Sequence, residues 1–166
     1  DHLAPVNAMF DLVLGGEGKF RKRPFGTVVS CPIVSPLTFG PTKTEISMAV
    51  ARAGTPITIA PAPQSGATAP AALAGTMVLS VAEALAALVA INLVQPGHPV
   101  VMGNATFVSD LRTGAFSGGG GEQAVLAAAS AQMSNFYGIP SGVLAGMSDS
   151  KLPDNQAGFE KAITDL

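Results

Sequence analysis

Short apolar runs alternate along the chain with longer segments whose apolar residues recur at helical spacing. The runs lie at residues 27–34, 56–60, 99–104 and 139–145. Each is followed by a polar or glycine-rich stretch and then by a helical pattern, which predicts a strand, a loop and a helix in turn. A further helical pattern at residues 3–14 ends at a pair of glycines. We therefore expect one helix followed by four strand–helix units.

The helix boundaries are marked by proline and glycine. Pro41 fits the first turn of a helix over 41–53, where its missing N–H is not needed, and Gly54 fits the end of that helix. Pro32 predicts an irregularity or a strand end inside the first apolar run. The three later helices are predicted at residues 69–94, 122–137 and from 153 onward.

Strands that alternate with helices favour an α/β fold with a parallel sheet. The runs are almost continuously apolar, which is typical of strands buried on both faces. The long polar loops follow the strands, so they should gather at the carboxyl side of the sheet, where barrels and open sheets place their sites. Four units make half of an eightfold barrel and also suit a small open sheet. The 166 residues fit one domain, with a helix and loop at 1–26 and the four units at 27–166.

The segment at residues 69–94 is long enough to cross a membrane. Glu83 lies at its centre and much of its apolar content is Ala and Gly, which suits a helix packed tightly against a sheet instead. The chain begins with Asp and stops inside a helical pattern. We therefore expect a fragment of a longer protein.

Charge and cysteine content narrow the possible partners. The formal net charge is −2, which provides no electrostatic footprint for nucleic acid, and the basic cluster at residues 19–23 is expected to be a solvated loop. One cysteine excludes an internal disulfide framework. The two histidines lie far apart, and no spacing of ligand residues resembles a metal site.

The loops that follow the strands supply the candidate site residues. The candidate catalytic carboxylates are Asp149 and Asp110. The candidate substrate-binding residues are Phe39, Gln64, Asn104, Phe107, Lys151 and Gln156. Asp149 and Lys151 are equally suited to form an ion pair, and Asp154 is expected to cap a helix.

Four glycines in succession, Gly118, Gly119, Gly120 and Gly121, come directly before the third predicted helix of the strand–helix units. A glycine loop at a helix N-terminus can hold a phosphate group. The glycines follow the preceding strand by more than ten residues and no phosphate-loop motif is present. A mobile loop or lid is therefore the favoured interpretation, with a phosphate cradle as the alternative.

Four longer blocks of sequence carry the most specific signal. They are SPLTF at residues 35–39, PITIAPAPQSGATAPAALAGTMVLSVAEALA at 56–86, QPGHPVVMGN at 95–104 and SDSKLPDNQAGFEKA at 148–162. In wording, order and spacing these blocks resemble the central part of the trimethylamine methyltransferase family, and the resemblance extends from about residue 23 onward. Family members are much longer, which agrees with a fragment.

The resemblance implies a (β/α)8 barrel, of which this chain would form about half. It also implies transfer of a methyl group from a methylated amine to the cobalt of a separate corrinoid protein, so the corrinoid (cobalamin) is carried by that partner. Founding members carry pyrrolysine, which this chain does not show. Relatives without pyrrolysine include enzymes that demethylate glycine betaine.

Simple chemistry links the missing pyrrolysine to the substrate. Cobalt(I) would be the nucleophile, and a quaternary ammonium releases a neutral tertiary amine without further activation. Such an enzyme mainly has to position the substrate and stabilise its cation. Aromatic faces contribute roughly 0.5–2 kcal/mol each through cation–π attraction. Phe39, Phe107 and Phe116 are candidates for this role, although each would also fit as packing beneath a loop, and Asp110 or Asp149 would add a carboxylate.

The sequence thus predicts part of a cytoplasmic, corrinoid-dependent methyltransferase for a quaternary or tertiary amine. A half barrel exposes sheet edges and an apolar inner face, so we also expect a homo-oligomer or a self-associating fragment. The competing prediction is a non-catalytic small-molecule or phosphate-binding α/β domain that uses the glycine loop at residues 118–121. Neither prediction includes a metal site in this chain, a nucleic acid or a membrane partner.

Overall fold

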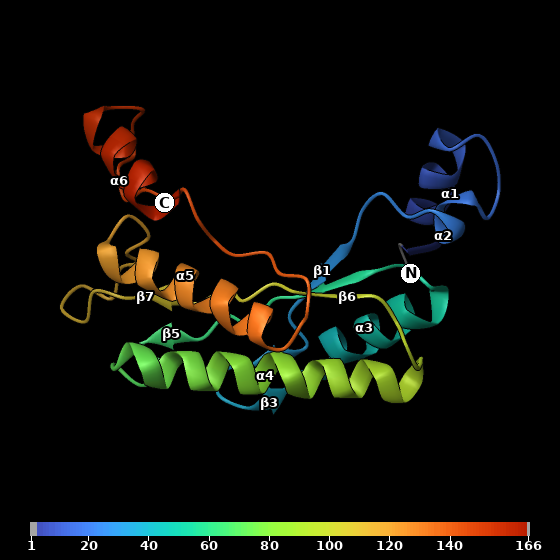
Figure 1. Ribbon diagram of the computed structural model, residues 1–166, viewed down its shortest axis with the longest axis horizontal. Coiled ribbons are helices and arrows are strands. Elements are labelled where there is room, and N and C mark those ends of the chain that lie inside the picture. The colour runs from blue at the N-terminus through green and yellow to red at the C-terminus, as the bar shows by residue number, and fades with distance from the viewer. Residues whose placement is uncertain (1–2, 166) are drawn as a thin grey trace.

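A three-stranded parallel sheet forms the centre of the fold in the computed structural model, which describes residues 3–165. Its strands are β1 (Val28–Ser30), β4 (Ile57–Ile59) and β6 (Val100–Met102). They lie in the order β1-β4-β6, which is also their order along the chain (Figure 1). The predicted parallel α/β fold is therefore confirmed.

Helices connect the strands and pack beside the sheet (Figure 1). They are α3 (Pro41–Ala53), α4 (Leu73–Val94) and α5 (Gly121–Phe136), and each contacts the next in sequence. α3 and α4 also contact β4. The predicted bounds of α3 are confirmed, with Pro41 in its first turn and Gly54 closing it in a left-handed conformation at φ 76°. α6 (Asn155–Asp165) packs against α5 near the C-terminus.

Two small strand pairs extend the loops that follow β1, β4 and β6. β2 (Ile33–Val34) and β3 (Thr38–Phe39) form an antiparallel hairpin, and β5 (Gln64–Ser65) pairs in parallel with β7 (Phe107–Val108). The predicted strand at residues 27–34 is thus two separate strands, β1 and β2. The break falls at Cys31 and Pro32, because proline cannot donate a hydrogen bond to the ladder.

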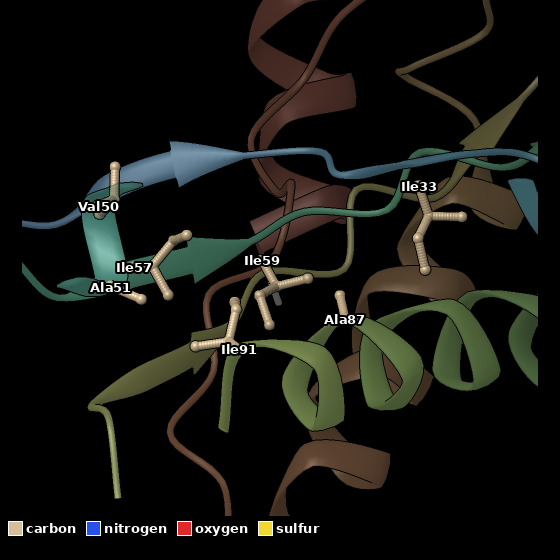
Figure 2. Packing of buried hydrophobic residues seen from close by; sticks show 7 residues of the cluster. All are labelled: Ile33, Val50, Ala51, Ile57, Ile59, Ala87 and Ile91. Atoms are coloured by element: carbon tan, nitrogen blue, oxygen red, sulfur yellow. The ribbon is translucent and has the colours of Figure 1, made fainter. Parts of the chain in front are cut away.

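The core lies between the sheet and the helices. One buried cluster, shown in Figure 2, joins β2, α3, β4 and α4 and consists of Ile33, Val50, Ala51, Ile57, Ile59, Ala87 and Ile91. A second cluster joins α4, β6 and α5 and consists of Met77, Val81, Ala84, Met102 and Leu126. The helices therefore bury one face of the sheet.

The opposite face of the sheet is open. The central residues of the three strands, Val29, Thr58 and Val101, align in register and point away from the helices. The side chain of Val29 is 67% exposed. The prediction that the strands are buried on both faces is therefore wrong for the described residues, because nothing among them covers this side.

The predicted fourth strand at residues 139–145 is also wrong as a full strand. Only Ser141 pairs with the sheet, through a parallel bridge to Met102. The Met102 N–H donates to Pro140 O at 2.8 Å, and the Gly142 N–H donates to Met102 O at 3.1 Å. Pro140 has no N–H for the ladder, which limits the pairing. The segment nevertheless adds a fourth parallel position beside β6, again in chain order.

The basic cluster is partly helical, which corrects the predicted loop, although its side chains Lys19, Arg21, Lys22 and Arg23 are exposed to solvent as predicted. Lys19–Lys22 forms the short helix α2 after α1 (Leu3–Val13). Phe20 is only 2% exposed, because its ring packs against those of Phe10 and Phe25 at centroid distances of 4.7 and 5.2 Å. Asp11 accepts hydrogen bonds from the N–H groups of Gly18 and Phe20 at 2.8 and 2.7 Å. Aromatic packing and the Asp11 carboxylate therefore hold this charged segment against α1.

α4 is the one helix among residues 3–165 that is long and apolar enough to cross a membrane by length and composition alone. It begins at Leu73, four residues later than predicted. In the structure it packs against β4, α3 and α5, and its central Glu83 is fully buried. These contacts are those of a core helix in an α/β fold.

Candidate functional site

The loops that follow β4 and β6 meet where β5 pairs with β7. This pairing sets Gln64 opposite Phe107 in register. The Phe107 ring packs edge to face against Phe116 at a centroid distance of 4.9 Å. Phe116 remains 38% exposed. The predicted binding residues Gln64 and Phe107 are thus brought together on the carboxyl side of the sheet, and Phe107 also forms an aromatic pair with Phe116.

Asn104 lies in the segment between β6 and β7 that leads into this region. It is 2% exposed, and its Oδ1 accepts a hydrogen bond from Ser80 Oγ on α4 at 3.2 Å. Its Nδ2 has no hydrogen-bond partner among the described residues. An unpaired buried donor costs about 1–3 kcal/mol. Asn104 therefore has an amide donor available for a water molecule or a polar ligand.

Two further buried polar atoms nearby in the sequence also lack partners among the described residues, Ser109 Oγ and Gln123 Oε1. Gln123 lies in the first turn of α5, and its Nε2 donates to Thr106 O at 2.9 Å. That bond ties α5 to the segment that carries Asn104. The carboxyl side of β6 therefore contains three buried polar side chains, each with one side-chain atom that has no hydrogen-bond partner among the described residues.

Phe39 is presented by a hairpin that α4 holds in place. The buried carboxylate of Glu83 accepts hydrogen bonds from Ser35 Oγ at 2.7 Å and from the Leu37 N–H at 2.9 Å. Leu37 has a positive φ of 53°. Phe39 follows in β3 and is 43% exposed. Glu83 thereby fixes the turn from which Phe39 emerges.

Asp149 and Glu160 join the glycine loop to the C-terminal segment. The Asp149 carboxylate accepts hydrogen bonds from the Gly118 N–H at 2.6 Å and from Ser117 Oγ at 3.1 Å. Glu160 on α6 accepts one from the Asp149 N–H at 2.8 Å. We call this arrangement of Ser117, Gly118, Asp149 and Glu160 the carboxylate clamp. It places the predicted catalytic Asp149 at a contact between two loops.

Further contacts hold Glu160 in this position. Ser148 Oγ and Gln156 Nε2 each donate to its carboxylate at 2.8 Å. The bond from Gln156, followed by those from Ser148 and Asp149, lowers the pKa of Glu160 below its ordinary value. Gln156, a predicted binding residue, therefore supports the clamp through Glu160.

Asp110 organises its own loop. Its carboxylate accepts hydrogen bonds from the Arg112 N–H at 2.9 Å and from Thr113 Oγ1 at 3.1 Å, and it forms an ion pair with Arg112 Nε at 3.4 Å. The bond from the Arg112 backbone is the main reason that the pKa of Asp110 is lowered. The exposed turn at residues 110–115 is thus held by this carboxylate.

Among the described residues of the fourth loop, the predicted helix cap at Asp154 is confirmed, and Lys151 lies exposed without an ion pair to Asp149. Asp154 caps α6, because its Oδ1 accepts the Ala157 N–H at 2.9 Å. Lys151 is exposed, and no ion pair joins it to Asp149 in the described chain. Within residues 3–165, no group of three or more His, Cys, Asp or Glu residues is placed to hold a metal ion.

Two of the four glycines, Gly119 and Gly120, lie against acidic side chains. A Cβ atom at Gly119 would meet the carboxylate of Glu160, and one at Gly120 would lie 3.1 Å from Glu122 Oε2. Gly118 is equally crowded, by Phe116 and Met147. Carboxylates beside the loop repel an anion, so the geometry disfavours the alternative of a phosphate cradle. Close packing explains Gly118, Gly119 and Gly120 instead, whereas a Cβ atom at Gly121 would meet no atom within 4 Å among the described residues, its chain neighbours aside.

Some of these side chains carried little signal in the sequence. Glu83 stood out only as the lone charge in a long apolar helix. Gln123 and Glu160 look like ordinary helix-surface residues, and only the fold shows that Gln123 is 1% exposed and that Glu160 meets the glycine loop. Glu83 has partners 48 and 46 residues away, Gln123 has one 17 residues away, and Glu160 reaches Asp149 across 11 residues, so no local motif records these contacts.

Comparisons with known proteins place the sequence of this chain in a family. The family described as trimethylamine methyltransferase (MTTB) matches residues 3–165. The chain is 39% identical over 152 residues to the trimethylamine methyltransferase MttB of Methanosarcina thermophila, covering 92% of this chain and 31% of that protein. It is 38% identical over 153 residues to a glycine betaine methyltransferase of Desulfitobacterium hafniense, covering 92% and 32%. The chain thus spans about a third of the length of these curated relatives, and it belongs to the trimethylamine methyltransferase family.

Proposed function

We propose that this chain is part of an enzyme that transfers a methyl group from a methylated amine, preferably a quaternary one such as a betaine, to the cobalt of a separate corrinoid protein. The family match over residues 3–165 carries this proposal. Relatives of nearly equal identity are named for trimethylamine and for glycine betaine, which supports a methylated amine as the substrate class.

The proposed whole is a cytoplasmic (β/α)8 barrel of which this chain forms about half. Two observations support the barrel. The sheet runs in chain order from β1 through β4 and β6 to the bridge at Ser141, which is the order that a barrel requires. The uncovered face at Val29, Thr58 and Val101 would then line the barrel interior, where the remaining strands would bury it.

The aromatic pair of Phe107 and Phe116 is the proposed contact for the substrate cation. A quaternary ammonium has no N–H to donate, so its recognition depends on aromatic faces and on carboxylates. Gln64, opposite Phe107, and the free Nδ2 of Asn104 would bind polar groups elsewhere on the substrate, such as the carboxylate of a betaine. The roles of Phe39, Lys151, Gln156, Asp110 and Asp149 in substrate binding or catalysis stay predictions.

The methyl acceptor belongs to the partner protein. When bound, that corrinoid supplies the nucleophilic cobalt, so the residues of this chain need only hold the substrate and exclude water. The hydrogen-bonded loops described above suit that task because each is fixed to a helix, the hairpin by Glu83 and the glycine loop by the carboxylate clamp.

Steady-state methyl transfer by the full-length protein tests the assignment of Phe107. Phe107→Leu should raise KM for a quaternary amine by about 5- to 30-fold, the effect of losing roughly 1–2 kcal/mol of cation–π attraction. Phe136→Leu is the matched control, since Phe136 is 77% exposed on α5 and lies outside the proposed site. Equal KM values for the two variants would remove Phe107 from the site.

A further inference from the structure

The most exposed positions of α4, on the side that points away from the sheet, carry no polar side chain. Its exposed residues follow one another at intervals of four, four, four, three and four positions, which places them on one side of the helix. They are Ala74, Val78, Ala82, Ala86, Val89 and Leu93. We call this surface the α4 stripe. A helix that faces water normally carries charged residues on that side, so the α4 stripe is typical of a face that another surface covers.

The large side chains of the α4 stripe are strongly exposed: Val78 is 71%, Val89 55% and Leu93 81% exposed. An apolar groove of about 530 Å³ adjoins them, between α4 and α5. Val81, Leu85 and Met133 are among its lining residues, and no charged residue is. The stripe and groove form one continuous apolar surface.

We infer that the α4 stripe and its groove are the interface through which two copies of this protein associate. The topology carries the first step of the argument. α4 lies between α3 and α5, and the free edges of the sheet are at β1 and at Ser141. Strand–helix units added at either edge would pack beyond α3 or α5, so completing the sheet in this way does not cover the α4 stripe.

The chemistry of the surface favours a second copy as the occupant. A two-fold axis across α4 would place the stripe against its own counterpart, and an uncharged apolar stripe is complementary to itself. Ala74, Ala82 and Ala86 allow two helices to approach closely. A membrane surface is less suited, because neither the stripe nor the groove lining includes a Lys or Arg to meet lipid headgroups.

The size of the surface fits a dimer. α4 has 22 residues and is therefore about 33 Å long at a rise of 1.5 Å per residue. Together with the adjoining edge of α5 the surface is about 20 Å wide, since packed helices lie 8–10 Å apart. The resulting face, roughly 650 Å², is close to the ~800 Å² per partner of a standard stable interface.

Sedimentation velocity of the full-length protein over a range of concentrations tests the inference. The wild type should sediment as a dimer or as a multiple of one. Ala82→Glu should weaken the dimer by about 100-fold or more, because it buries two unpaired carboxylates per interface. The matched control is Ala128→Glu, since Ala128 is exposed on α5 and is not among the groove-lining residues. It should leave the mass unchanged.

A second variant guards against misfolding. Val78→Lys changes a side chain on which the fold does not depend, and circular dichroism should show wild-type helix content for all three variants. A monomeric wild type would overturn the inference, and so would an assembly that both Ala82→Glu and Val78→Lys leave intact. A monomer that floats with phosphatidylcholine vesicles, and stops doing so in Ala82→Glu, would assign the surface to a membrane instead. None of these outcomes depends on the methyltransferase assay.

Discussion

Replacing Glu83 should destabilise the protein strongly, because its buried carboxylate is the acceptor for two groups of the hairpin turn. In Glu83→Ala the Leu37 N–H and the Ser35 hydroxyl lose their partner. Hydrogen bonds to a charged group contribute about 1.5–3 kcal/mol each. Removing the buried charge recovers part of that loss, since burying a carboxylate is itself costly. We therefore expect a net loss of about 3–5 kcal/mol in the free energy of unfolding.

Urea unfolding of the purified protein measures this loss, and a double-mutant cycle isolates the contact. Glu83→Gln should cost less, about 1–2 kcal/mol, because an amide oxygen still accepts the Leu37 N–H. Combining Glu83→Ala with Ser35→Ala should reveal a coupling energy within the range of roughly 0.5–3 kcal/mol found for residues in contact. The control is Glu45→Ala, an exposed glutamate on α3. A loss no larger in Glu83→Ala than in Glu45→Ala would refute the anchoring role.

Three further predictions concern the core, the carboxylate clamp and the glycine loop. Leu126→Ala should lower the free energy of unfolding by about 2–5 kcal/mol, because Leu126 is fully buried; a loss below 1 kcal/mol in urea unfolding would contradict the packing described. Folding lowers the pKa of Glu160, so its contribution to stability is complete above its ordinary pKa of 4.5 and is lost as the pH falls through the folded pKa. In Glu160→Gln the urea midpoint of unfolding should therefore depend less on pH below pH 4.5. A pH dependence equal to that of the wild type would contradict this. Calorimetric titration with inorganic phosphate should give no binding heat in the wild type or in Gly119→Leu, and tight binding that Gly119→Leu abolishes would restore the phosphate-binding alternative.

The repeating part of the fold could be predicted from the sequence, because it depends on local patterns. The apolar runs marked β1, β4 and β6, and Pro41 and Gly54 marked the two ends of α3. Two expectations failed, one for a non-local and one for a local reason. Nothing among residues 3–165 covers the second face of the strands, which no local pattern could reveal, and the fourth strand shrinks to Ser141 because Pro140 interrupts the ladder.

The site was predictable as a region and less so as a set of contacts. Loop position located Gln64, Asn104 and Phe107, and the structure sets Gln64 and Phe107 side by side. The sequence could not show that Asp149 binds the glycine loop, because that contact spans 31 residues. It also could not distinguish the buried Glu83 from a charge that simply interrupts an apolar helix.

The central claim is methyl transfer from a quaternary amine, and its products test it most directly. The full-length protein would be incubated without oxygen with a cobalt(I) corrinoid protein and either glycine betaine or trimethylamine, and the amine products would be identified by mass spectrometry. We predict dimethylglycine from glycine betaine, in step with the change in corrinoid absorbance, and no demethylation of trimethylamine. Demethylation of trimethylamine alone would contradict the quaternary preference. No product from any methylated amine, with folded protein and several corrinoid proteins tried, would contradict the proposed function itself.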